Sequence, residues 1–304
     1  MYKISKKTTK EIKVQTIRFG VIGTENSHVN QACKRFNVEK TIQGGFVEAL
    51  YPGEGDTLEH VKEVQEQGNV PLLVDKPEDM IGKVDAVIIM NRHGKYHAKY
   101  AKLFLKNKIP TLVDKPITCN LEEAKELIAL SHKTNTWFSS SSTVWKTSSF
   151  QNFFKQAKDE LGSIHSGMVG GPFDFESEFG GVFFYGIHTV EMLLKGFGYD
   201  VETVSAKLYG KNCFVTTTLK SGKLVSLHLI GEGGGKFQVL LHCKKGSRYL
   251  QVDMSDGYDM GFKMLVEGIK NNARPLTDEQ LLMPVKVLLA IDKSAKINKE
   301  IEII

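Results

Sequence analysis

Val84-Asp-Ala-Val-Ile-Ile-Met90 is the stretch that decides the fold class of this chain. It is rich in β-branched residues, apolar on both faces and too short for a typical helix, so it predicts a strand buried in a parallel sheet. Similar strand segments and helical segments alternate around it: strands at 17–23, 46–51, 72–74 and 111–113, and helices at 27–36, 58–67, 97–105 and 121–132. Such alternation indicates βαβ units. Residues 1–136 are therefore expected to form an α/β, Rossmann-like, doubly wound parallel sheet.

The second half of the chain has a different pattern. Glycines become frequent, and strand-like stretches follow one another at 202–208, 213–220, 224–230, 237–242 and 249–252. Ser221-Gly222 and Lys245-Gly246 lie where hairpin turns are expected. Residues 137–277 thus predict an α+β second domain with an open, mainly antiparallel sheet. Helical periodicity returns near the end and predicts a closing helix over 278–298 that packs back on the first domain.

Composition excludes several classes of protein. The 304 residues carry 40 Lys and Arg against 35 Asp and Glu, a net charge of +5, and 41% are hydrophobic, as in ordinary globular proteins. No run approaches the roughly 18 apolar residues of a membrane span, and the basic start, residues 1–13, lacks the apolar core of a signal peptide. The four cysteines form no CxxC pair, which favours a reducing, cytoplasmic compartment. Without a basic cluster interleaved with aromatics, nucleic acid is not an expected partner.

The exit of the first strand, Gly23-Thr24-Glu25-Asn26-Ser27-His28, lies where a dinucleotide-binding fold carries GxGxxG. Only Gly23 fits, and Glu25 stands at the second glycine, where an acid would repel phosphates. Ser27 is expected to cap the next helix. The second strand ends at Tyr51 instead of an acid that would bind a ribose hydroxyl. On these residues alone, NAD binding and a plain strand–helix turn both remain open.

A family resemblance comes from motifs spread along the chain. They are 84–89, His97, 111–116, 161–164, 180–188 and 294–296. In this order they resemble the motifs of the Gfo/Idh/MocA oxidoreductases. The resemblance implies a two-domain NAD- or NADP-dependent enzyme that transfers a hydride to or from a sugar, an inositol or a related polyol.

The resemblance also implies the catalytic residues. Asp114-Lys115-Pro116 matches the EKP motif of the family, in which the lysine lies between nicotinamide and substrate. Lys115 is therefore expected to stabilise charge or pass a proton at the reacting oxygen. A second copy, Asp75-Lys76-Pro77, precedes the 84–90 strand and is not expected to matter.

His188 matches the histidine that moves the hydroxyl proton in the family. The aspartate that the family places four residues earlier is Phe184 here. We therefore expect His188 to act alone or with a nearby acid such as Glu191 or Glu176.

The remaining predicted contacts surround the expected cofactor. Arg92 and His93 replace the family's Thr and Pro beside the nicotinamide ribose. Because Gly94 separates His93 from His97, no zinc site is predicted. The predicted cofactor contacts, for NAD or NADP, are Gly23, Thr24, Glu25, Asn26, Ser27, His28, Asn91, Arg92, His93, His97 and Asp114. The predicted substrate contacts are Lys146, Glu176 and Tyr185.

Three departures from the family pattern keep other functions open: Glu25, Tyr51 and Phe184. One alternative is a non-redox ligand-binding or regulatory descendant that binds a small anion. Another is an acid/base enzyme that uses His188 and a nearby glutamate. In each case we expect a small-molecule ligand, no membrane partner, and a homodimer or homotetramer formed through the sheet of the second domain.

Overall fold

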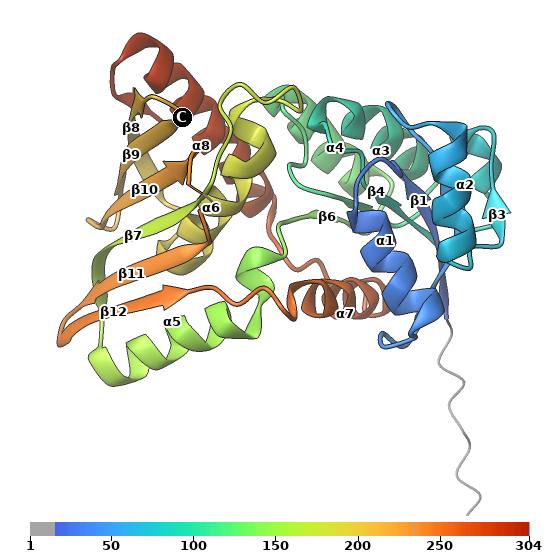
Figure 1. Ribbon diagram of the computed structural model, residues 1–304, viewed down its shortest axis with the longest axis horizontal. Coiled ribbons are helices and arrows are strands. Elements are labelled where there is room, and N and C mark those ends of the chain that lie inside the picture. The colour runs from blue at the N-terminus through green and yellow to red at the C-terminus, as the bar shows by residue number, and fades with distance from the viewer. Residues whose placement is uncertain (1–15, 234, 304) are drawn as a thin grey trace, which may run out of the picture.

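The computed structural model describes residues 16–233 and 235–303, which form two lobes (Figure 1). In the sequence, residues 1–13 contain no apolar core of a signal peptide. These residues lie outside the described part of the chain. Within the described ranges, no helix combines the length and the apolar character needed to cross a membrane.

The first lobe is built on a six-stranded parallel sheet with the strand order β3-β2-β1-β4-β5-β6. Its strands are β1 (Ile17–Ile22), β2 (Gly45–Tyr51), β3 (Leu72–Leu73), β4 (Ala86–Ile89), β5 (Thr111–Val113) and β6 (Phe138–Ser140). Phe19, Val21, Ile88 and Ile89 are almost completely buried, because helices cover both faces of the sheet. This architecture confirms the predicted doubly wound sheet.

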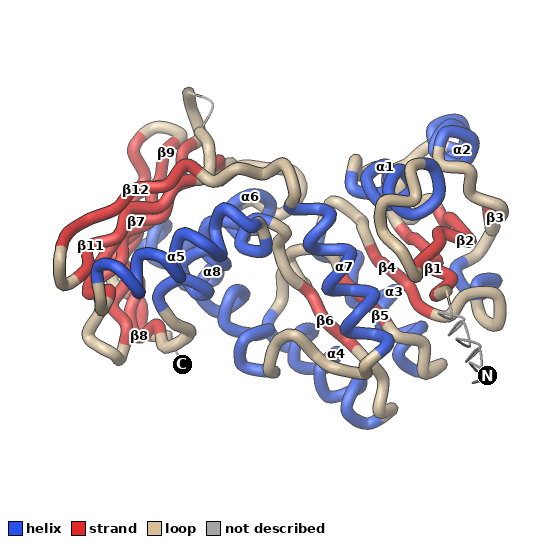
Figure 2. Tube along the Cα trace, turned by 90° about the horizontal axis from the view of Figure 1, so that it is seen from below, coloured by secondary structure: helices blue, strands red, loops and turns tan. Residues whose placement is uncertain are grey.

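Helices from both halves of the chain cover this sheet. They are α1 (His28–Cys33), α2 (Leu58–Gln67), α3 (His97–Lys106), α4 (Leu121–Lys133) and α7 (Gly257–Lys270). Helix α1 continues into a π-helical turn at Lys34–Val38. Helix α7, which the sequence did not predict, lies across β4, β5 and β6 (Figure 2) and buries Phe262, Leu265 and Val266 against the sheet. The first lobe therefore includes a segment from late in the chain.

The second lobe contains a seven-stranded sheet with the order β12-β11-β7-β10-β9-β8-β13. Its strands are β7 (Ile164–Pro172), β8 (Val201–Tyr209), β9 (Asn212–Leu219), β10 (Leu224–Ile230), β11 (Gln238–Cys243), β12 (Gly246–Gln251) and β13 (Ile301–Glu302). The sheet is mainly antiparallel, as predicted. It is not a simple meander, because β7 is inserted between β10 and β11 and runs parallel to β10.

Three helices pack against the second sheet or between the lobes: α5 (Ser148–Leu161), α6 (Val182–Phe197) and α8 (Asp278–Ile297). Most of α6 is buried, so its polar side chains His188 and Glu191 are carried into the interior. Helix α8 begins with a capping box in which Thr277 and Gln280 bond each other's backbone. It packs mainly on β8 and α6 and also contacts α4. The expected closing helix thus lies on both lobes.

Candidate active site

The turn after β1 requires a glycine. Gly23 has a φ of +91°, and a Cβ atom there would lie 2.3 Å from the backbone nitrogen of Asn91. The exits of β1 and β2 are also joined, because Gly23 N donates to Tyr51 O at 3.1 Å and Thr24 N donates to Pro52 O at 3.1 Å. The single glycine left from the dinucleotide motif is the one on which this close approach depends.

Glu25 does not point freely toward a phosphate position. Its Oε1 accepts a hydrogen bond from Arg92 N at 2.8 Å and a longer one from Asn91 Nδ2 at 3.5 Å. Burial raises the pKa of Glu25. Glu25 Oε2 and Asn91 Oδ1 are buried acceptors without a hydrogen-bond partner in the described chain. Two such acceptors suit the hydroxyl donors of a ribose, so this turn fits a nucleotide sugar.

The sequence did not predict an acid beside the β1 turn, where the nucleotide is expected to bind. Tyr51 ends β2, but Asp56 in the following loop accepts a hydrogen bond from the hydroxyl of Thr24. Asp56 also accepts from Thr57 N at 2.8 Å and bonds His60 Nδ1 at 2.8 Å. An acid therefore stands beside the β1 turn, supplied five residues after the expected position, and only the path of the loop reveals it.

The structure corrects two expectations, the helix cap at Ser27 and the accessibility of His97. Ser27 is exposed and makes no capping hydrogen bond with its side chain. His97 is fully buried, with Nδ1 2.7 Å from Pro116 O and Nε2 2.7 Å from Asn91 O. His97 therefore holds the exits of β4 and β5 together and has no surface for a cofactor.

His28 and Asp114 meet between α1 and the exit of β5. His28 Nδ1 lies 2.7 Å from Asp114 Oδ2. Asn26 steadies the pair, because its Nδ2 donates to Met90 O at 3.1 Å and its Oδ1 accepts from His28 N at 3.2 Å. Burial alone would raise the pKa of Asp114, but the charges of His28 and Lys115 outweigh it and hold that pKa well below its usual range. Asp114 is thus an ionised carboxylate whose side chain is only 14% exposed.

Lys115 follows Asp114 and is buried, with 6% of its surface exposed. Its Nζ lies 5.6 Å from the centre of the Phe184 ring on α6. Among the described residues it has no hydrogen-bond or ion-pair partner. The residue that replaces the family's aspartate therefore gives Lys115 a cation–π contact and no negative charge.

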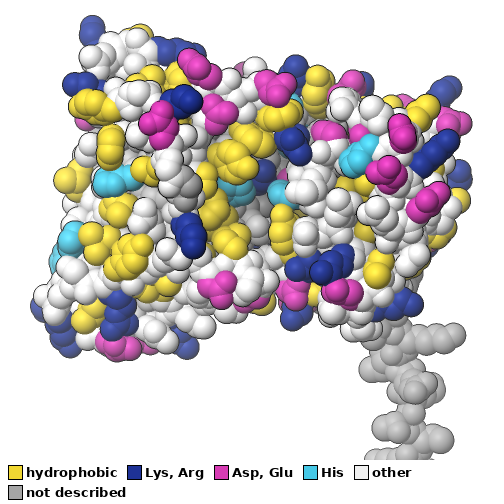
Figure 3. All heavy atoms as spheres, in the orientation of Figure 1, with side chains coloured by type: hydrophobic (Ala, Val, Ile, Leu, Met, Phe, Trp, Pro, Cys, Tyr) yellow, Lys and Arg dark blue, Asp and Glu magenta, His cyan; other side chains and the backbone are white. Residues whose placement is uncertain are grey.

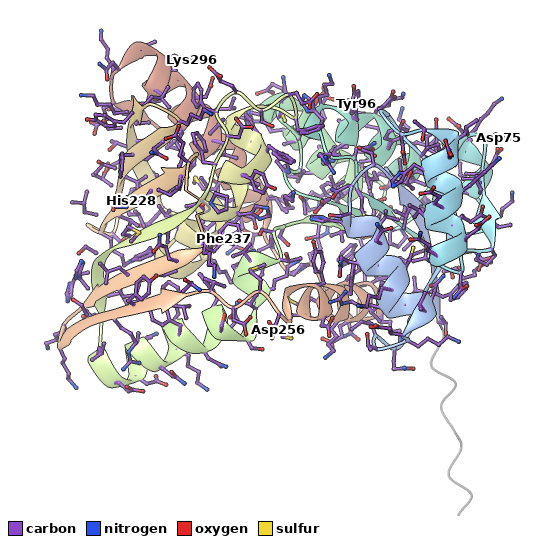
Figure 4. The ribbon with its side chains drawn as sticks, in the orientation of Figure 1. Asp75, Tyr96, His228, Phe237, Asp256 and Lys296 are labelled. Atoms are coloured by element: carbon purple, nitrogen blue, oxygen red, sulfur yellow. The ribbon has the colours of Figure 1, made fainter. Side chains whose placement is uncertain are left out.

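His188 lies on the same helix as Phe184, one turn further on. Its Nδ1 is 2.7 Å from Ser142 Oγ. Burial lowers the pKa of His188 well below its usual value, and the nearby charges of Lys115 and His28 lower it further. The ring packs against Phe237, which Figure 4 labels, with 5.4 Å between ring centres. His188 is therefore neutral at neutral pH.

Glu191 is buried one turn beyond His188 and is already hydrogen-bonded. Its Oε2 accepts from Ser142 N at 2.8 Å and from Trp145 Nε1 at 2.8 Å. Burial raises the pKa of Glu191 to about 7. Lys146 is also buried, and burial lowers its pKa to about 8. Lys146 lines a cavity of about 40 Å³ with His28, Asp114 and Tyr258.

The lobes touch at the loop after β4. Arg92 donates to Glu25 O at 3.0 Å, and its guanidinium lies 5.0 Å from the centre of the Phe179 ring of the second lobe. His93 packs on Tyr96 with 5.9 Å between ring centres, and burial lowers its pKa. In Figure 3, hydrophobic, histidine and basic (Lys or Arg) side chains gather between the two lobes.

The predicted substrate contacts do not all meet. Glu176 and Tyr185 line a pocket of about 730 Å³ at the end of β7, with Lys211 on its other side. Lys146 lies in the smaller cavity. The second Asp-Lys-Pro copy lies away from all of these residues, with Asp75 at the outer edge of the first lobe (Figure 4). Within residues 16–233 and 235–303, no group of three or more His, Cys, Asp or Glu is placed to hold a metal.

This geometry defines a two-lobed protein with a dinucleotide-type turn and a buried lysine between the lobes. Residues 17–141 match the family described as "Oxidoreductase family, NAD-binding Rossmann fold", which is Gfo/Idh/MocA. The predicted resemblance is thereby confirmed over residues 17–141 of the first lobe, which match the Gfo/Idh/MocA oxidoreductases. The description of the family also agrees with the predicted nicotinamide cofactor.

Known relatives extend the comparison. The "Uncharacterized oxidoreductase YhhX" of Escherichia coli (strain K12) is 28% identical over 187 residues, which cover 53% of this chain and 51% of YhhX. The chain thus spans about half the length of the curated relative that it matches.

Solved structures share the fold over nearly the whole chain. Myo-inositol 2-dehydrogenase from Lactobacillus plantarum is 15% identical, with a TM-score of 0.84 over 95% of this chain and 100% of that one. Scyllo-inositol dehydrogenase from Lactobacillus casei with bound NAD(H) and scyllo-inositol is 14% identical, with a TM-score of 0.82 over 95% and 99%. At this identity the likeness shows the two-domain fold.

Proposed function

We propose that this protein transfers a hydride between NAD or NADP and a carbinol carbon of a sugar, an inositol or a related polyol. The observation that carries the proposal is Lys115: it is buried, unpaired in the described chain, and placed at the exit of β5 facing α6. Its ammonium makes a cation–π contact with Phe184 and has no hydrogen-bond or ion-pair partner among the described residues, so a ligand can supply one. A reacting oxygen that becomes partly negative is such a partner.

The residues of the β1 and β4 exits would hold the nucleotide. Gly23 gives the backbone its close turn, and Glu25 and Asn91 offer acceptors for ribose hydroxyls. The nicotinamide ring supplies the hydride acceptor or donor when it is bound. Lys115 would polarise the substrate oxygen. His188, neutral and hydrogen-bonded through Nδ1 to Ser142, would offer Nε2 to a second substrate hydroxyl.

The presence of Phe184 favours a second candidate function. In this alternative the protein binds a small anion and carries out no redox chemistry. Because Phe184 replaces the family's aspartate, no carboxylate is bonded to Lys115 in the described chain, and the neighbouring Asp114 is bonded to His28 instead. An anionic ligand would supply the bonded carboxylate or phosphate that Lys115 lacks.

Cofactor titration separates the two candidates. We expect NADH or NADPH fluorescence to change on binding to the purified protein, and no binding of either at millimolar concentration would exclude the redox proposal. If a cofactor binds, Lys115→Ala should lower the rate of cofactor reduction by polyols far more than it lowers cofactor affinity. Lys76→Ala, in the second Asp-Lys-Pro copy, is the matched control and should change neither. Equal losses of rate and affinity in Lys115→Ala would contradict the role given to the lysine.

We also propose a homodimer or homotetramer formed through the second sheet. The outer face of this sheet carries exposed apolar side chains, among them Tyr209, Phe214 and Leu224. Phe214 packs against Tyr209 and His228 with ring centres 5.9 and 4.9 Å apart, so they form one aromatic cluster on this face. Exposed apolar patches of this kind mark interaction surfaces.

A further inference from the structure

We propose that His28 and Asp114 are the acid–base pair of this site. In this arrangement Asp114 orients the imidazole through Nδ1, and Nε2 exchanges the hydroxyl proton of the substrate during hydride transfer. The inference rests on the proposed function. It assigns the exchange of the substrate hydroxyl proton to two residues of the first lobe.

The geometry of the pair supports this role. The 2.7 Å contact joins side chains that are 18% and 14% exposed, so both are held yet His28 keeps an open edge. A carboxylate on Nδ1 favours the tautomer with the proton on that nitrogen, which leaves the lone pair on Nε2. In the described chain, Nε2 of His28 has no hydrogen-bond partner. The ring is fixed from the other side by Tyr258 of α7, whose ring centre is 5.3 Å away at 76°.

The other titratable groups of the site are less suited to exchange this proton. Phe184 has no proton to exchange. His188 is bonded at Nδ1 to the hydroxyl of Ser142 and not to a carboxylate, and burial, together with the charges of Lys115 and His28, lowers its pKa. Glu191 is occupied by two N–H donors. The His28–Asp114 pair instead joins a base to a carboxylate that can stabilise the imidazolium.

Charged groups from every neighbouring element act on His28. The carboxylate of Asp114 lies 2.7 Å from its Nδ1, and the ammonium of Lys115 follows Asp114 in the chain. Lys146 lines the same cavity, and His188 lies within electrostatic reach on α6. Tyr258 of α7 is neutral at physiological pH, because burial raises its pKa to about 12. Asp114 is therefore the group that offsets the charge on His28 when the ring takes up a proton.

The proton and the electrons balance in both directions. In oxidation, the substrate O–H proton moves to His28 Nε2, and the C–H bond breaks as a hydride that reduces the bound nicotinamide. The carbinol becomes a carbonyl, and Asp114 stabilises the imidazolium. In reduction the same proton returns to the alkoxide oxygen. Oxidation thus needs neutral His28, and its rate should fall as acid protonates the ring.

The first test needs neither substrate nor cofactor. In ¹⁵N-histidine NMR of the whole protein, we expect His28 to show the Nδ1–H tautomer and to lose this preference in Asp114→Asn. If the proton of His28 is fixed on Nε2, or if the ring does not titrate between about pH 5 and 9, this inference is overturned. The proposed function would then still stand.

The second test measures the reaction. With myo-inositol, scyllo-inositol and D-glucose as probes, His28→Asn should lower the rate of cofactor reduction about 100-fold or more. The rate of this variant should no longer fall at acid pH, and added imidazole should restore part of it. The affinity of the variant for NADH should stay within about threefold of wild type. His132→Asn breaks a similar histidine–aspartate contact, 2.7 Å from Asp278 on the surface, and should change nothing.

The outcomes are distinct. An unchanged acid limb in His28→Asn, or a loss of NADH binding equal to the loss of rate, would refute the acid–base role while leaving the proposed function in place. Absence of cofactor reduction by the wild type on all three probes would overturn the proposed hydride transfer and, with it, this role.

Discussion

Glu191→Gln should make this protein more stable at pH 8 and leave its stability nearly unchanged at pH 4.5. Glu191 is buried on α6, and its pKa is raised by burial from an ordinary 4.5 to about 7. An acid with a higher pKa in the folded than in the unfolded chain holds its proton longer when folded. The folded state therefore loses stability as pH rises from about 4.5 to 7.

The size of the effect follows from the pKa. A rise of about 2.5 units at about 1.4 kcal/mol per unit corresponds to about 3 to 4 kcal/mol at pH 8. For a chain of this length, that is a melting-temperature difference of about 5 °C. Glutamine keeps an oxygen that can accept from Ser142 N and Trp145 Nε1, so the hydrogen bonds survive. Attraction between ionised Glu191 and Lys146 reduces the gain, so about 3 to 4 kcal/mol is its upper limit.

The assay is thermal unfolding followed by circular dichroism at pH 4.5, 6, 7 and 8. Glu63→Gln, on an exposed position of α2, is the control and should show no such trend. A difference between Glu191→Gln and wild type that does not vary with pH would refute the reasoning. So would a glutamine variant that is less stable than wild type at pH 8.

Three further predictions concern the turn, the cleft and the sheet. Gly23→Ala should abolish NADH binding in fluorescence titration and lower the melting temperature, since its Cβ would lie 2.3 Å from Asn91 N; retained affinity would show that this turn does not hold the nucleotide. Phe184→Asp gives Lys115 an anionic neighbour and should weaken inhibition of cofactor reduction by small carboxylates such as oxalate, whereas unchanged inhibition would mean that Lys115 is not the anion contact. Phe214→Lys, in the outer aromatic cluster, should shift the protein to a smaller species in analytical ultracentrifugation, and an unchanged mass would place the interface elsewhere.

The sequence predicted the local elements well where one periodicity dominates. Helix α2 was expected and found at 58–67, and β10 at 224–230. Helix α7 was missed, because Gly257 and Gly261 lower its helical propensity. Packing of Phe262 and Leu265 against the first sheet forms this helix, and that contact joins residues far apart in the chain.

By itself, the sequence determined the strand that the structure shows at Ala86–Ile89, the Asp114-Lys115-Pro116 motif and the family that residues 17–141 match. These features depend on residues that are neighbours in the chain. The tertiary structure alone decided that Asp114 meets His28, that Asp56 reaches Thr24, and that Lys115 faces Phe184. Those contacts arise because crossover connections bring strand exits together and α6 packs across them, and no local pattern of residues encodes which side chains then meet.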